Sequence, residues 1–110
     1  MRERLPNRRE SRTLGLWHQR ERYHVSYSRN GTRIAEVFLH GPKAGSALDA
    51  IAFDIGVALS LALQSGTDIC DLRKSVSRLE DGQPASIVGA VLDRLAPLDN
   101  LTPLEELAHD

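Results

Sequence analysis

One long apolar stretch constrains the fold of this chain more than any other feature. Residues 48–63 carry apolar side chains at three- and four-residue spacing, which predicts an α-helix of about four turns. Ser46 stands before the stretch and can cap its first turn, and Gly66 follows as a left-handed C-terminal cap. The side opposite the main stripe is also apolar or small. Because this helix is so poor in charge, we expect it to be buried on several sides, at the centre of the fold.

Two strand patterns precede this helix and meet at a turn. Residues 23–29 alternate apolar and polar side chains, as in a strand with one buried face, and residues 34–39 supply a return strand. Asn30-Gly31 lies between them, and both residues tolerate the positive φ that a type I′ hairpin turn requires. With a two-residue loop, the hairpin pairs two sets of side chains: Tyr27 with Ile34, and Tyr23 with Phe38.

Shorter elements flank this core pattern. Residues 14–19 can form a short strand with Trp17 as its largest apolar anchor. After the long helix, two further helices are predicted over residues 68–79 and 86–96, each beginning at a side chain that can cap it. Residues 103–108 can add one more helical turn.

The predicted fold class is therefore α+β. A short antiparallel sheet of two or three strands, with an Asn-Gly hairpin, is followed by three helices, of which the first is central and buried. We divide the chain into an Arg-rich extended arm (residues 1–12), one α+β domain (residues 13–96) and an acidic tail (residues 97–110).

Composition excludes several classes of site. Cys70 is the only cysteine, so no intrachain disulfide and no cysteine metal cluster can form, and the four histidines show no helical metal-ligand spacing. We expect no catalytic residues, no metal and no cofactor. No apolar run approaches the ~20 residues that cross a bilayer, so we expect no membrane association and, by default, a cytoplasmic location. Asp68 and Asp71 disfavour a thiolate at Cys70, which we expect to be inert and partly buried.

One turn has the composition of an anion site. Lys43, Gly45 and Ser46 stand just before the N-terminus of the long helix, where free backbone N–H groups can hold an anion or nucleotide. The spacing is not that of a Walker A loop, and a simple strand-to-helix turn is the alternative. Ser60, further along the helix, is expected to bond back to its own helix.

Charge is distributed unevenly along the chain. Residues 1–33 carry nine Arg and three Glu, or +6, whereas residues 34–110 carry five basic and twelve acidic side chains, or −7. Arg4, Arg8 and Arg9 can bind an acidic protein surface or nucleic acid. No aromatic residue interleaves with this arm, which weakens a base-stacking role, and a solvated arm is the third interpretation.

Several segments, taken in order, resemble a known family. They are Arg4-Leu5-Pro6-Asn7-Arg8-Arg9, Tyr23-His24-Val25, Ala35-Glu36-Val37-Phe38-Leu39, Lys43-Ala44-Gly45-Ser46, Ile51-Ala52, Leu59-Ser60-Leu61-Ala62-Leu63-Gln64-Ser65-Gly66, Ala85-Ser86-Ile87 and Leu107-Ala108-His109. This series is similar to the C-terminal region of vitamin B12-dependent (class II) ribonucleotide reductases, whose related accessory domain is called TSCPD. Where the Thr-Ser-Cys-Pro-Asp motif of the family would fall, this chain has Ala85-Ser86-Ile87-Val88-Gly89, without the Cys and the Asp.

The resemblance implies relatedness to ribonucleoside-diphosphate reductase but not catalysis by this chain. Ribonucleotide reduction needs a thiyl radical and a pair of reducing thiols, which a single cysteine cannot supply. We therefore expect a stand-alone accessory or regulatory module that binds a protein partner, with a ribonucleotide reductase subunit as one candidate. The alternatives are a nucleotide- or anion-binding module using the turn at residues 43–46, and a nucleic-acid-associated protein using the Arg-rich arm. Apolar area on the long helix also leads us to expect a homodimer.

Overall fold

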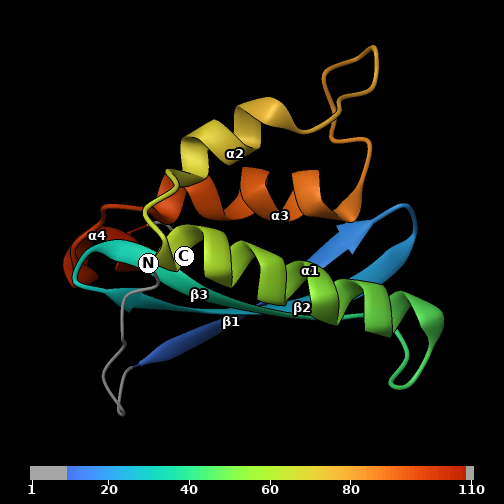
Figure 1. Ribbon diagram of the computed structural model, residues 1–110, viewed down its shortest axis with the longest axis horizontal. Helices are drawn as coiled ribbons and strands as arrows, with labels where there is room; N and C mark the ends of the chain where they lie inside the picture. Colours follow the sequence, from blue (N-terminus) through green and yellow to red (C-terminus); the bar gives the residue numbers. More distant parts are fainter. Residues whose placement is uncertain (1–9, 109–110) are drawn as a thin grey trace.

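The computed structural model describes residues 10–108, and its elements form an α+β fold (Figure 1). Three strands are followed by helices, as predicted. In chain order the elements are β1 (Ser11–His18), β2 (Glu21–Asn30), β3 (Arg33–His40), α1 (Ala47–Gln64), α2 (Ile69–Ser75), α3 (Ile87–Leu95), the 3-10 turn η1 (Ala96–Leu98) and α4 (Pro103–Leu107).

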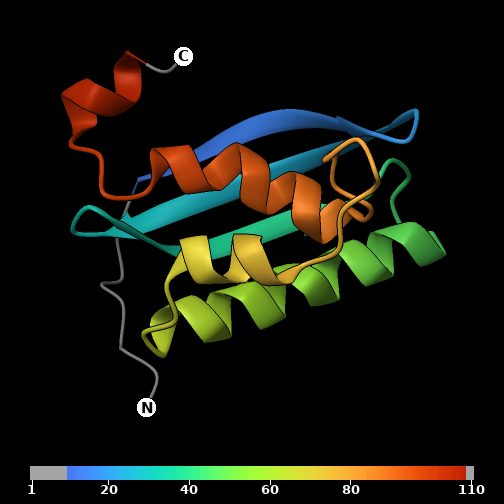
Figure 2. The same cartoon turned by 90° about the horizontal axis from the view of Figure 1, so that it is seen from above.

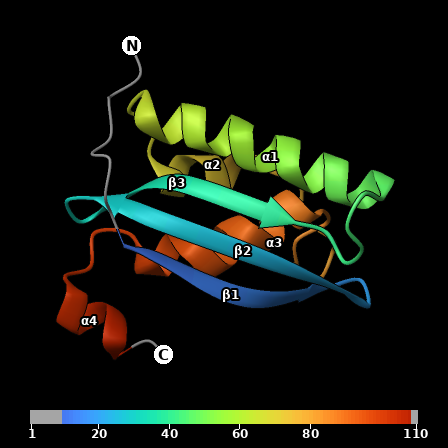
Figure 3. The same ribbon diagram turned by 90° about the horizontal axis from the view of Figure 1, so that it is seen from below.

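The strands make one antiparallel sheet in the order β1-β2-β3. Seen from above and from below, α2 and α3 lie over one face of the sheet, while α1 runs beside β3 along its edge (Figures 2 and 3). Alternate residues of the strands point into the core between sheet and helices, where they meet the inner sides of the helices. The fully buried side chains of this core are Val25, Val37, Leu39, Ile69, Val91, Leu92 and Leu95.

The loop of the predicted hairpin is shifted by one residue, and its turn type is found in the other hairpin. The β2–β3 hairpin is present, but Asn30 pairs with Arg33 inside the ladder, so the loop is Gly31-Thr32, with φ of 68° at Gly31. Both residues of the other loop, Gln19-Arg20, have positive φ, as a type I′ turn requires. The predicted type I′ geometry therefore belongs to the β1–β2 hairpin.

The predicted side-chain pairs across β2 and β3 are wrong as a consequence. A register shift between Ser28 and Arg29 adds a residue to β3, so that Tyr27 lies opposite Val37. Tyr23 lies beyond the end of that ladder and pairs with Leu16 of β1. An irregularity of this kind bends a strand and is invisible to a count of alternating residues.

The structure corrects three local expectations. Trp17 is no anchor, because its ring lies on the open face of the sheet, 64% exposed, with the Arg22 guanidinium 5.7 Å from the ring centroid. The second helix is shorter than predicted and ends at Ser75. Cys70, in its first turn, is exposed rather than partly buried.

The first helix packs along the β3 edge of the sheet with one side buried, and its opposite side is exposed. Ala52, Gly56 and Leu59 are buried against the rest of the fold. The opposite side stays exposed because α1 packs mainly on β3. By length and composition alone α1 could also cross a membrane, which is weak evidence for a helix that packs on a sheet.

The connection between α2 and α3 is held by a charged cluster and has a testable pH dependence. Arg78 donates two hydrogen bonds to Asp93, at 2.5 and 2.6 Å, and Arg73 donates a third at 2.8 Å. The hydrogen bonds from Arg78, joined by those from Arg73, outweigh burial and lower the pKa of Asp93 to about 2. A carboxyl with a depressed pKa stabilises the fold above its unfolded pKa, and that stability is lost as the pH falls through the folded pKa.

We therefore expect the free energy of unfolding of the native chain to fall between pH 5 and pH 2 by about 1 kcal/mol more than that of Asp93→Asn, after allowance for solvent screening. Urea unfolding followed by circular dichroism across this range measures both. Asp54→Asn, on the exposed side of α1, is the matched control and should keep the native slope. Equal slopes for the native chain and Asp93→Asn would contradict the assignment.

Candidate functional site

The best-defined contact in the fold is the one between α1 and the edge of β3. The hydroxyl of Ser60 accepts the N–H of Val37 at 2.9 Å and lies 3.0 Å from the Val37 carbonyl, to which it donates. One turn later, Gln64 donates to the carbonyl of Ala35 at 2.9 Å. A Cβ on Gly56, one turn earlier, would lie only 3.0 Å from the Val37 carbonyl oxygen. Ser60 and Gln64, four residues apart, thus pair with three backbone groups on the free edge of β3, so the expectation that Ser60 bonds to its own helix is wrong.

Docking through one narrow side leaves the rest of α1 facing solvent. We define the α1 outer face as the exposed residues of this helix. They are Ala47, Leu48, Ala50, Ile51, Phe53, Asp54, Val57, Ala58 and Leu61. The five large apolar side chains among them are each between 42% and 54% exposed. Asp54 is the only charged residue of the set, so the face is a nearly uncharged apolar surface, of the kind that marks an interaction site.

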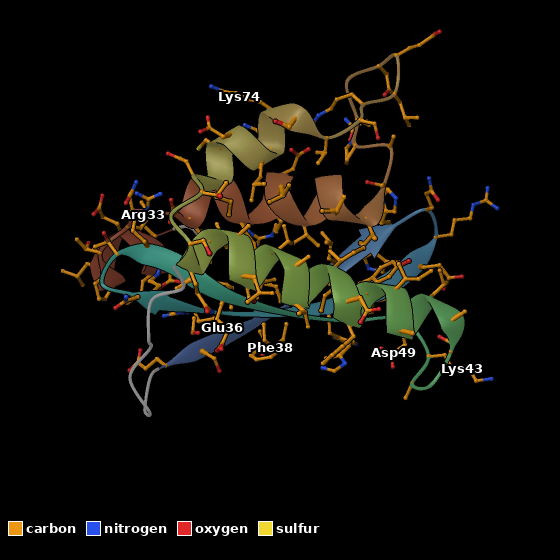
Figure 4. All side chains as sticks on the ribbon, viewed as in Figure 1. Arg33, Glu36, Phe38, Lys43, Asp49 and Lys74 are labelled. Carbon is orange, nitrogen blue, oxygen red and sulfur yellow. The ribbon has the colours of Figure 1, made fainter. Side chains whose placement is uncertain are left out.

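An exposed aromatic side chain stands on the strand that α1 packs against. Phe38, on β3, is exposed and points with Glu36 away from the helices on the open side of the sheet (Figure 4). Its Cα lies 3.5 Å from the position that a Cβ on Gly56 would take, so it borders the helix directly. The backbone of β3 at Phe38 therefore lies against the buried side of α1, and the Phe38 side chain belongs to the open face of the sheet.

The turn before α1 is held by a carboxylate of the chain itself. Asp49 accepts the N–H of Gly41 at 2.9 Å and that of Gly45 at 3.1 Å. These backbone hydrogen bonds, that from Gly41 first, lower the pKa of Asp49. Ser46 caps the helix by accepting the N–H of Asp49 and donates to the carbonyl of Lys43, which stands exposed at the turn (Figure 4). An anion at Lys43, Gly45 and Ser46 would compete with Asp49 for the N–H of Gly45, and its binding there stays a prediction.

The arginines predicted to bind a partner, Arg4, Arg8 and Arg9, lie outside the described residues. Within residues 10–108 no three His, Cys, Asp or Glu side chains gather in a way that could hold a metal ion.

A buried acidic residue in the tail was not singled out from the sequence. Glu106, only 6% exposed, accepts hydrogen bonds from the Tyr27 hydroxyl and, at 3.4 Å, from Arg29, and lies 3.4 Å from the Nε of Arg12. Burial, followed by the hydrogen bond to Glu106, raises the pKa of Tyr27 to about 12. Burial opposes ionisation of Glu106, but the hydrogen bonds from Tyr27 and Arg29 outweigh it and lower its pKa. The Nη2 of Arg29 lies 3.2 Å from Glu106 but makes no hydrogen bond, and the cluster fastens α4 to the sheet.

Comparison with known proteins places the chain in a family. No curated protein and no solved structure matches it. The family model of the TSCPD domain matches residues 2–97, which is most of the chain. This domain is found at the C-terminus of B12-dependent ribonucleotide reductases. The chain belongs to the TSCPD domain family.

Proposed function

We propose that this chain is an accessory or regulatory module without catalytic activity of its own, and that it acts by binding a protein partner through the α1 outer face. The observation that carries the proposal is the exposure of five large apolar side chains on a helix with a single charge on that side. Water contact with this area is unfavourable, and burial of apolar area stabilises a complex by roughly 25 cal/mol per Å² before the costs of association.

We infer that the partner is a ribonucleotide reductase. The family supports this choice, since TSCPD domains occur joined to B12-dependent reductases. A domain found covalently attached to an enzyme has a surface suited to that enzyme or to its neighbouring domains. A free copy can use the same surface without the linker, at a lower effective concentration.

The proposed role is regulatory because the chemistry of reduction is missing from this chain. One cysteine, exposed at Cys70, cannot act as both the thiyl radical and the pair of reducing thiols. Activity in deoxyribonucleotide synthesis would therefore come from the partner, with this module changing its rate or assembly. A cytoplasmic location, where nucleotide reduction takes place, is part of the same proposal.

The experiment mixes the purified chain with the B12-dependent reductase of the same host and measures binding by calorimetry. We expect a complex with the native chain and at least a tenfold weaker one with Val57→Lys. A lysine at the centre of the α1 outer face would place a charge in the apolar contact. The matched control is Lys43→Ala, which removes an exposed charge just before the N-terminus of α1, outside this face. This variant should bind as the native chain does.

Turnover provides the second readout. With adenosylcobalamin, ribonucleotide and a dithiol, the chain alone should form no deoxyribonucleotide, whereas its addition should change the rate of the host reductase. Val57→Lys should lose that effect in parallel with binding. Deoxyribonucleotide formation by the chain alone, or native affinity in Val57→Lys, would contradict the proposal.

A further inference from the structure

The two edge strands of the sheet differ in whether their outward backbone groups have partners. The direction of these groups follows from the strand pairing. Val37 directs both its N–H and its carbonyl toward Ser60, away from β2. Backbone groups alternate in direction along a strand, so Tyr27, which lies opposite Val37, directs its own groups toward Arg12 of β1.

The same alternation fixes the direction of the groups in β1. The set that includes Arg12 and Leu14 faces β2, so the set that includes Thr13, Gly15 and Trp17 directs its N–H and carbonyl groups to the outside. Among residues 10–108, no backbone hydrogen bond outside the regular elements ends on these three residues, and all three are exposed. Within the part of the chain that the structure describes, α1 pairs with backbone groups on the β3 edge, whereas no such partner stands at the β1 edge.

The open edge lacks most of the devices that keep a strand from pairing further. Proline, bulges and a short length are the usual ones. β1 is eight residues long, contains no proline, and pairs with β2 in unbroken register. Its single inward charge, Arg12, is near one end and bound to Glu106, which leaves the middle of the strand free to pair.

We propose that the β1 edge pairs antiparallel with the β1 edge of a second copy of this chain, joining the two sheets into one of six strands. The inward row of the edge favours a second copy over an arbitrary extended peptide. Leu14 and Leu16 are only half-buried at the edge of the core. Antiparallel pairing centred on Gly15 sets each Leu14 opposite a Leu16 of the other copy. The half-buried leucines at the edge of each core would then cover one another. The central pair, Gly15 with Gly15, has no side chains to obstruct the approach.

This inference does not rest on the proposed function, because the two surfaces lie on opposite edges of the sheet (Figure 3). Sedimentation velocity over micromolar concentrations should show a monomer–dimer equilibrium. Amide hydrogen exchange by NMR then identifies the interface without any substitution. Protection of the Thr13, Gly15 and Trp17 amides should rise with concentration by at least tenfold, while that of Arg12 and Leu14 should stay constant. A strict monomer, or a dimer in which the first three amides exchange as in the monomer, would overturn the proposal.

Substitution gives an independent test. Thr13→Pro removes an N–H that faces outward and spares the β1–β2 ladder, so we expect a folded monomer, whereas Thr13→Val keeps the N–H and should keep the dimer. Val57→Lys should remain dimeric although it loses the proposed reductase partner. Dissociation by Val57→Lys would mean that copies pair through α1, and would refute pairing at β1 while leaving apolar docking intact.

Discussion

Replacing Gly56 with leucine should destabilise the domain by about 3 kcal/mol, at the upper end of the cost of overpacking a well-packed contact. The first atom of the new side chain would already lie 3.0 Å from the Val37 carbonyl oxygen and 3.1 Å from the Leu39 amide nitrogen. Both are backbone atoms of a strand held in the sheet, so they cannot rotate away as a flexible side chain would. The remaining carbons of leucine would force α1 off the strand and break the bonds made by Ser60 and Gln64.

Thermal and urea unfolding measure this loss of stability, and two further variants serve as comparisons. Ala58→Leu puts the same side chain on the exposed side of the same helix, where it should change the free energy of unfolding by no more than about 0.5 kcal/mol. Gly56→Ala combines a milder clash with a gain in helix propensity of about 1 kcal/mol, so it should lie between the other two. If Gly56→Leu were as stable as Ala58→Leu, the close approach of α1 to β3 would be wrong.

Leu59→Ala should cost about 2–5 kcal/mol, the range for a leucine removed from a packed interior. Leu59 is 6% exposed and belongs to the buried cluster that includes Val37 and Leu39. Shortening it removes buried methyl groups and leaves a cavity between helix and sheet, which rigid strands cannot fill.

The matched control for this variant lies two residues away. Leu61→Ala removes the same atoms from a side chain that is 43% exposed on the α1 outer face, and should cost less than about 1 kcal/mol in the isolated chain. In a binding assay with the reductase the order of the two effects should be the opposite. There Leu61→Ala should weaken the complex more than Leu59→Ala does. Equal losses of stability at Leu59 and Leu61 would show that α1 is covered on both sides.

Local signals in the sequence predicted α1 well because they are of short range. Ser46 caps the helix as expected, and the apolar repeat that follows sets its length. Ser86 likewise begins α3. Caps and periodicity depend on residues within one or two turns of each other, so they can be identified without knowledge of the tertiary fold.

The candidate site could be predicted only in part, because it depends on which side of α1 meets the sheet. Apolar residues surround this helix almost completely, so hydrophobicity alone could not separate Leu59, which is buried, from Leu61, which is exposed. The stronger signal was the row of small and polar residues spaced by four, Gly56, Ser60 and Gln64. These residues approach or bond a strand edge, a contact whose partner lies far away in the sequence.

The same long-range character explains why Glu106 was missed. Its partners Tyr27 and Arg29 lie 79 and 77 residues earlier in the chain, beyond the reach of any local pattern. An acidic residue in a short terminal helix is ordinarily solvated, and its burial here depends on the sheet that receives it.

The pairing of Arg12 with Glu106 also determines how this domain can be joined to other polypeptides. It brings the beginning and the end of the described chain to one corner, near β1, whereas α1 runs along the opposite edge of the sheet (Figure 3). A polypeptide that continues from α4 would therefore leave the described part of the domain beside β1, on the side away from α1. In a fusion protein this corner would be crowded by the neighbouring domain, so that gene fusion itself would favour the apolar helix over the sheet edge as the accessible surface.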